Sequence, residues 1–215
     1  MGNPYPGIFR IGMEAPEVVA ELMKIHPEVE YIKLQEYTPH VLGVTEQLKK
    51  DPEISVKNMV RHHPDAGEYA IRLKRADVTS DKLRDLIFKA TQRGKALVLC
   101  SKVETSEDEI LHIPMLDFEC AVSSQNLSKA EDFVRELKDI GLILESGRSY
   151  HYYSFNVVPH NRWLKFMARS LLFTGFIDCR HIGHRILSGE ARLRLAKIEG
   201  SDRYLQTPRV ISIVG

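Results

Sequence analysis

The chain has 215 residues, of which 43% are hydrophobic and 27% are charged, and its formal net charge is +1. This composition is that of an ordinary globular protein and excludes an intrinsically disordered chain. No apolar run approaches the roughly 18 residues of a membrane-spanning helix, and the amino terminus lacks the pattern of a signal peptide. We therefore expect a cytoplasmic protein with no membrane partner.

Helices and strands alternate in the first half of the chain. We predict a helix over 15–25, strands over 29–37 and 67–75, a helix over 79–94 and a strand over 95–102. The second of these helices begins at a hydroxyl cap candidate and ends at Gly94. A charged segment, 103–109, should form a loop.

The alternation continues in the second half. We predict strands over 113–122 and 149–158, helices over 126–141 and 159–175, and strands over 176–187, 191–197 and 209–215. Ser128 and Glu131 have capping-box spacing, and Trp163 and Phe166 should belong to the core. This order of elements predicts an α+β fold with a mixed or antiparallel sheet. The loop at 103–109 suggests two lobes, residues 1–105 and 106–215, within one composite domain.

The cysteines and the charge distribution limit the kinds of site. Cys100, Cys120 and Cys179 have no CxxC spacing, so we expect three strand cysteines, without a disulfide framework or a zinc site. Residues 147–215 contain eleven Lys and Arg, nine of them Arg, against four Asp and Glu. Guanidinium groups form bidentate contacts with phosphate, although a solvated basic face would give the same count.

Two carboxylates lie on the strand predicted over 113–122. Asp117 and Glu119 are two positions apart and therefore share a face of the strand. Clustered carboxylates are the ligands that Mg²⁺ and Mn²⁺ prefer, but two acids on a solvated strand face would look the same. Asp178, preceded by apolar residues on another predicted strand, favours the metal. Three converging acids could hold two ions, as in nucleotidyl transfer.

A phosphate-binding segment is the third feature. Ser149 and His151 share one strand face, and Arg148 lies in the turn just before them. Hydroxyl, imidazole and guanidinium groups all donate hydrogen bonds that suit a phosphate. A single strand histidine is more often a structural residue.

Taken in order, "LDFE", "SYH" and "ID" resemble the three motifs of the archaeo-eukaryotic primase superfamily, with intervals similar to those of the compact plasmid-type members. The resemblance implies an N-terminal α/β unit packed against an RRM-like sheet that carries the acids, with the active site between them. It implies that Asp117, Glu119 and Asp178 are catalytic and bind two Mg²⁺ or Mn²⁺ ions, and that Ser149 and His151 contact the incoming nucleotide. Glu119 replaces the commoner second Asp.

The implied activity is template-directed joining of a nucleoside triphosphate to a 3′-hydroxyl with release of pyrophosphate. The implied partners are nucleoside triphosphates, a DNA or RNA template-primer and, for replication or repair, a helicase or similar protein. Further basic residues could contact the triphosphate or the nucleic-acid backbone, or could form ion pairs with the acidic first half. For the nucleotide these are Arg148, Arg192 and Arg194; for the nucleic acid they are Arg180, His181, His184, Arg185 and the pair His62–His63.

Two other functions fit the same residues. A non-catalytic RRM-like module would read bases with aromatic side chains, for which Tyr150, Tyr152 and Tyr153 are candidates. A two-metal nuclease or phosphohydrolase would use the same three acids. The aligned carboxylates favour an enzyme over the binding module, because carboxylates repel phosphate unless a metal ion is present.

Overall fold

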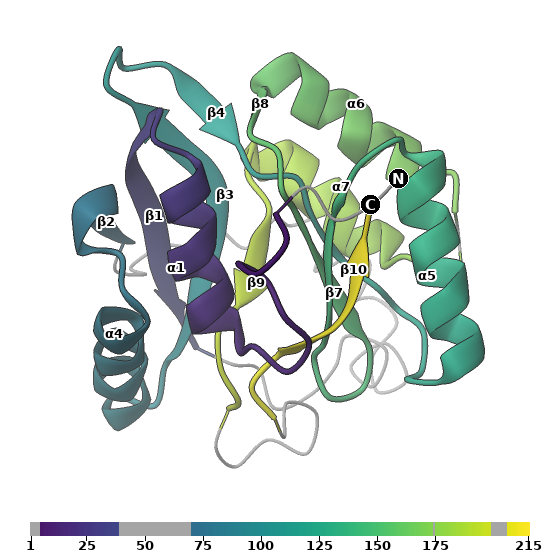
Figure 1. Ribbon diagram of the computed structural model, residues 1–215, viewed down its shortest axis with the longest axis horizontal. Helices are drawn as coiled ribbons and strands as arrows, with labels where there is room; N and C mark the ends of the chain where they lie inside the picture. Colours follow the sequence, from purple (N-terminus) through teal and green to yellow (C-terminus); the bar gives the residue numbers. More distant parts are fainter. Residues whose placement is uncertain (1–4, 39–69, 174, 199–205) are drawn as a thin grey trace, which may run out of the picture.

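The computed structural model of the chain describes residues 5–38, 70–173, 175–198 and 206–215. The start of the predicted 67–75 strand and the pair His62–His63 lie outside the described residues. Two antiparallel sheets, shown side by side in Figure 1, form the framework of the molecule. The α+β class is therefore confirmed, with antiparallel rather than mixed sheets.

The first sheet combines strands from both halves of the chain. Its order is β2-β1-β3-β4-β8, and β9 pairs with β3 beside that path. Its strands are β1 (Val29–Tyr37), β2 (Ala70–Lys74), β3 (Ala96–Thr105), β4 (Ile110–His112), β8 (Val158–Pro159) and β9 (Arg192–Arg194). The suggested boundary at residue 105 falls between β3 and β4, which pair with each other, and the division into two lobes stays a prediction.

The second sheet has the order β10-β6-β7-β5. Its strands are β5 (Met115–Asp117), β6 (Gly141–Glu145), β7 (Tyr150–Ser154) and β10 (Arg209–Val214). The edge strand β5 contacts β9 of the first sheet, so the two sheets meet where the predicted site residues lie.

The helices cover the outer sides of this pair of sheets. In Figure 1, α1 (Ala15–Ile25) and α4 (Ser80–Gln92) flank the first sheet, and α5 (Ser124–Glu136) flanks the second. A 3₁₀ turn over Arg75–Asp77 leads from β2 towards α4, and α6 (His160–Ser170) packs against α7 (Cys179–Ser188). None of the helices in the described segments is long and apolar enough to cross a bilayer.

Several element boundaries agree with the local chemistry of the sequence. Thr79 caps α4 by accepting a hydrogen bond from the Lys82 N–H at 3.1 Å, as its hydroxyl predicted. The helix α1 spans the predicted residues 15–25, whereas α6 begins one residue after its predicted start and ends at Ser170, five residues before its predicted end. Trp163 is fully buried and Phe166 packs against the core, which confirms both as core residues.

Other predictions are wrong at identifiable places. The segment 176–187 does not form the predicted strand, because residues 179–188 form α7. The strand β6 was missed between a helix and a turn, and α5 is capped by Ser123 rather than by the Ser128–Glu131 pair. Each error reflects tertiary packing or capping that overrides local propensity.

The cysteine prediction is only partly correct. Cys100 lies on β3, but Cys120 follows β5 in a loop and Cys179 begins α7. All three are free thiols. The buried Cys100 behaves as a small core residue, and burial raises the pKa of its thiol to about 12.

Candidate functional site

A short backbone bridge brings two of the predicted acids together. Phe118 pairs with Ile177 in an isolated antiparallel bridge, and the Glu119 N–H donates to the Phe176 carbonyl at 2.9 Å. Asp117 is the last residue of β5, and Asp178 directly follows Ile177. This bridge therefore places two carboxylates that are distant in sequence beside each other.

The pKa of the Asp117 carboxyl is raised by burial and in part by Asp178. Its side chain is half-buried, and burial, followed by the negative charge of Asp178, raises its pKa to about 7. Glu119 adds a smaller effect in the same direction, and the Arg194 guanidinium opposes both. Two neighbouring carboxylates of this kind are costly to ionise together, and a divalent cation between them would remove that cost.

Glu119 differs from Asp117 in its exposure. Its side chain is exposed, whereas that of Asp117 is half-buried. Within the described residues, no three His, Cys, Asp or Glu side chains lie close enough together to form a metal site without rearrangement. Metal binding by Asp117 and Asp178, with Glu119 as a third ligand, stays a prediction.

His151 is buried beside the acids. It is the register partner of Asp117 across β5 and β7, and its Nε2 lies 3.7 Å from the Asp117 Oδ1. Burial, then the charges of Arg194 and His181, lower its pKa well below the ordinary value, so the ring is neutral at pH 7. Its Nδ1 is buried and has no hydrogen-bond partner in the described part of the chain. A buried polar atom without a partner is costly, and a bound ligand would remove that cost.

The turn before β7 is held by backbone contacts. Ser149 donates its hydroxyl to the Phe118 carbonyl and so ties this turn to the strand of the first acid. Gly147 has φ of 108°, which favours glycine, and Arg148 is exposed beside it. Arg148 and Ser149 directly precede β7, the strand that carries His151. Their contact with a nucleotide stays a prediction.

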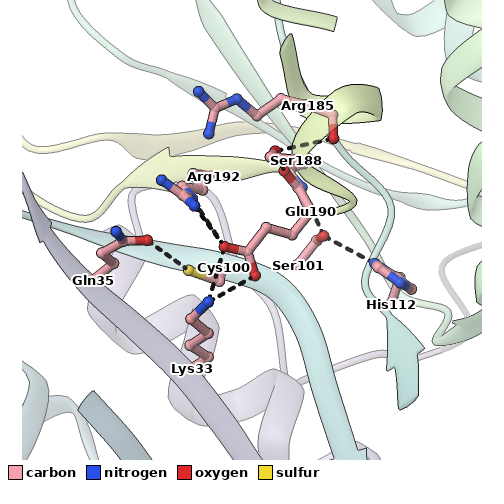
Figure 2. Close-up of polar contacts among 10 residues, drawn as sticks. Lys33, Gln35, Cys100, Ser101, His112, Arg185, Ser188, Glu190 and Arg192 are labelled. Atoms are coloured by element: carbon pink, nitrogen blue, oxygen red, sulfur yellow. Dashed lines mark hydrogen bonds and ion pairs between the residues drawn. The ribbon is translucent and has the colours of Figure 1, made fainter. Parts of the chain in front are cut away.

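The two arginines of β9 have different surroundings. Arg194 is buried and donates to the carbonyls of Ala196 and Gln206, at 2.7 and 2.8 Å, and to that of Ser146. Arg192 instead pairs with the buried carboxylate of Glu190, as Figure 2 shows. Nucleotide contact by either arginine is untested, but the positive charge of Arg194 acts on both Asp117 and His151.

The helix α7 carries the remaining predicted basic residues. Asp178 caps it by accepting the His181 N–H at 2.7 Å, so the second acid is fixed at the helix start. Burial and the nearby Arg185 lower the pKa of His181 to about 4. Arg180, His184 and Arg185 are half-buried on the same helix, and their contact with nucleic acid stays a prediction.

Two residues near this site were not singled out from the sequence. Lys33 lies on β1 and Glu190 in the turn between α7 and β9, and their side chains meet. Nothing in the sequence marks Lys33 as a site residue, because a lysine on a strand is ordinary and its partner is far along the chain. Glu190 is the single acid in "GEARLR", and this isolation among basic residues was the feature that could have marked it.

The arrangement of the two antiparallel sheets is shared with a solved primase-polymerase domain. The solved AEP domain of the cyanophage S-2L primase-polymerase (PrimPol) superposes on this chain with a TM-score of 0.51. The match covers 92% of this chain and 88% of that chain at 12% sequence identity, and it shows the shared fold. No curated protein matches the chain.

The family follows from a longer stretch of sequence. The model of the archaeo-eukaryotic primase 1D-like family matches residues 74–209, well over half of the chain. The chain belongs to the archaeo-eukaryotic primase superfamily, as the three motifs predicted.

Proposed function

We propose that this protein is a metal-dependent nucleotidyltransferase that extends or initiates a strand on a DNA or RNA template. The observation that supports this most is the proximity of Asp117 and Asp178 beside the buried His151. Family membership supports a primase or polymerase in general. The substrates would be a nucleoside triphosphate and a template-primer.

In this proposal Asp117 and Asp178, with Glu119, hold Mg²⁺ or Mn²⁺. Two such ions lower the barrier to attack by the 3′-hydroxyl and neutralise the charge on the leaving pyrophosphate. The neutral His151 ring donates one N–H to a phosphate oxygen, and its unpartnered Nδ1 is the atom suited to this contact. A neutral ring at this position adds no positive charge, so the cationic residues nearby must balance the triphosphate.

The non-catalytic binding module is less well supported. It requires aromatic side chains on an open sheet face, but Tyr150, Tyr152 and Tyr153 are all buried, each at most 1% exposed. The Tyr150 hydroxyl already donates to the Ser123 carbonyl at 2.9 Å. The described part of β7 therefore offers no stacking platform for bases.

Nucleotide binding provides the first test. We expect a fluorescent nucleoside triphosphate to bind the protein in Mn²⁺, and Asp117→Asn to weaken that binding by at least about tenfold, because a charge-assisted metal ligand is lost. Asp132→Asn is the matched control, since Asp132 lies exposed on α5, where it pairs with Arg135. Absence of binding by the wild-type protein would contradict the proposal.

The reaction itself distinguishes a transferase from a nuclease. A labelled primer on a template, incubated with Mn²⁺ and all four triphosphates, should become longer. Shortening of the same primer in the absence of triphosphates, with no extension in their presence, would favour the two-metal nuclease. Asp117→Asn and Asp178→Asn should both abolish the observed activity, whichever it is.

A further inference from the structure

A buried carboxylate joins two cations at the edge of the candidate site. The Glu190 side chain is 3% exposed, and both of its oxygens accept hydrogen bonds from the Lys33 ammonium, at 3.0 and 3.1 Å. Its Oε1 also accepts from the Arg192 Nε at 3.0 Å and Nη2 at 2.8 Å. Figure 2 shows Lys33 and Arg192 approaching Glu190 from different strands.

The two cations come from opposite sides of one strand. Lys33 belongs to β1 and Arg192 to β9, and both strands pair with β3. Arg192 is the register partner of Cys100, the β3 residue over which the cluster lies in Figure 2. Without Glu190, two positive groups this close would repel each other and separate.

The cluster and the acid pair both act on the charge state of His181. The charges of Asp178, Arg185 and Arg192 all act on His181. The same helix, α7, begins at Asp178 and ends just before Glu190. Ten helical residues extend about 15 Å, so one rigid element fixes the distance between the second acid and the buried carboxylate.

The turn that carries Glu190 is held at both ends. Gly189 ends α7 in the left-handed conformation, with φ of 69°, and the Glu190 N–H donates to the Arg185 carbonyl at 3.2 Å. On the other side the Ala191 N–H donates to the Ser101 Oγ at 2.9 Å. Because this backbone is fixed, the carboxylate oxygens are held in one position. They can therefore order the two flexible side chains that bind to them.

The Glu190 carboxylate is held in its ionised form by the two cations. Burial alone raises the pKa of Glu190, but the hydrogen bonds and charges of Lys33 and Arg192 outweigh burial and hold that pKa below its usual value. The described side chains of the cluster are one carboxylate and two cations, and Arg185 acts on the neighbouring Cys100. The Lys33 ammonium is partly exposed, so it can contact an anion while it is bonded to the carboxylate.

We propose that Glu190 is a positioning residue that orders Lys33 and Arg192 into one cation pair for the polyphosphate of the incoming nucleoside triphosphate. This inference rests on the proposed function. Lys33 is 37% exposed, so its ammonium can reach a ligand while it remains bonded to Glu190. Neither Lys33 nor Glu190 belongs to the three sequence motifs.

The substitution Glu190→Gln gives opposite outcomes for positioning and for simple charge. If the carboxylate only repelled the anionic substrate, its removal would strengthen nucleotide binding. If it orders the cations, the loss of charge-assisted hydrogen bonds lets Lys33 and Arg192 separate, and binding weakens. We expect the Kd of a fluorescent nucleoside triphosphate in Mn²⁺, and the KM for that nucleotide, to rise at least about tenfold, with kcat changing much less.

A second buried ion pair supplies the matched control. Glu36 on β1 is 7% exposed on its side chain and pairs with Arg93, and it neighbours Gln35, whose side chain points to the opposite face of the strand. Glu36→Gln should therefore lower the melting temperature by an amount similar to that for Glu190→Gln. It should leave the Kd and the KM for the nucleotide unchanged. Tighter or unchanged nucleotide binding by Glu190→Gln would overturn the inference.

Lys33→Met keeps the test decisive if Glu190→Gln fails to fold. Lys33 is partly exposed, and Met preserves most of its aliphatic stem, so this variant should fold. We expect it to weaken nucleotide binding several-fold and to add little further loss when combined with Glu190→Gln, because the two residues act as one unit. Unchanged binding in Lys33→Met would refute the cation pair. Failure of the wild-type protein to bind any triphosphate would instead refute the proposed function.

Discussion

Replacement of Gly141 by alanine should destabilise the strand that carries His151. Gly141 begins β6 and lies between β7 and β10. A Cβ there would lie 2.2 Å from the Tyr153 carbonyl oxygen, 2.8 Å from the Tyr152 hydroxyl and 2.9 Å from the Ser154 Cα. Two of these atoms are backbone of β7, so they cannot move aside by rotating a side chain.

The magnitude follows from two opposing effects. A Gly→Ala change in a compatible conformation stabilises by about 0.4–1 kcal/mol, because the unfolded chain loses entropy. Overpacking a filled interior costs about 1–3 kcal/mol, and a clash with backbone belongs at the upper end. We therefore expect Gly141→Ala to lower the free energy of unfolding by about 2 kcal/mol or more. Displacement of β7 should also weaken nucleotide binding through His151.

Urea unfolding at 25 °C, with and without the substitution, measures this change. Gly183→Ala is the matched control, since no atom lies within 4 Å of a Cβ at that position of α7. Alanine favours the helix over glycine, so this variant should gain about 0.5–1 kcal/mol. Equal or greater stability in Gly141→Ala than in the wild-type protein would refute the packing described for β6 and β7.

Two further predictions concern pH. The Asp117 carboxyl has a pKa of about 7 when folded and a lower one when unfolded, so the metal-free protein loses stability as pH rises from about 4 to 7. Asp117→Asn should therefore raise the melting temperature at pH 8 and have little effect at pH 4; a lower melting temperature at pH 8 would contradict the buried acid pair. Burial, followed by His160, lowers the pKa of His112 to about 4, so its contribution to stability is present above pH 6.5 and is lost as pH falls to 4. His112→Phe keeps a ring that can stack on Trp163 and should remove about 3 kcal/mol of the fall in the free energy of unfolding at low pH. Urea titrations at several pH values measure this fall. An unchanged pH profile would argue against a buried neutral ring.

Local sequence determined most of the secondary structure and the identity of the candidate acids. Short segments rich in apolar and β-branched residues specified β1 and β3, and a hydroxyl cap with a terminal glycine specified α4, because these features act within a few residues. The motif containing Asp117 and the later Asp178 could be recognised because each acid follows an apolar run. The order of the motifs was enough to indicate the family.

Only the tertiary structure decided how these pieces meet. The segment after Asp178 has the composition of a strand, but its carboxylate caps a helix and Ile182 is buried against the core, so α7 forms. The role inferred for Glu190 depends on Lys33, which is distant in the sequence. The two side chains meet because the strand of Lys33 pairs with β3. Contacts of this kind depend on pairing between strands that are distant in the sequence, and no window of local sequence contains that information.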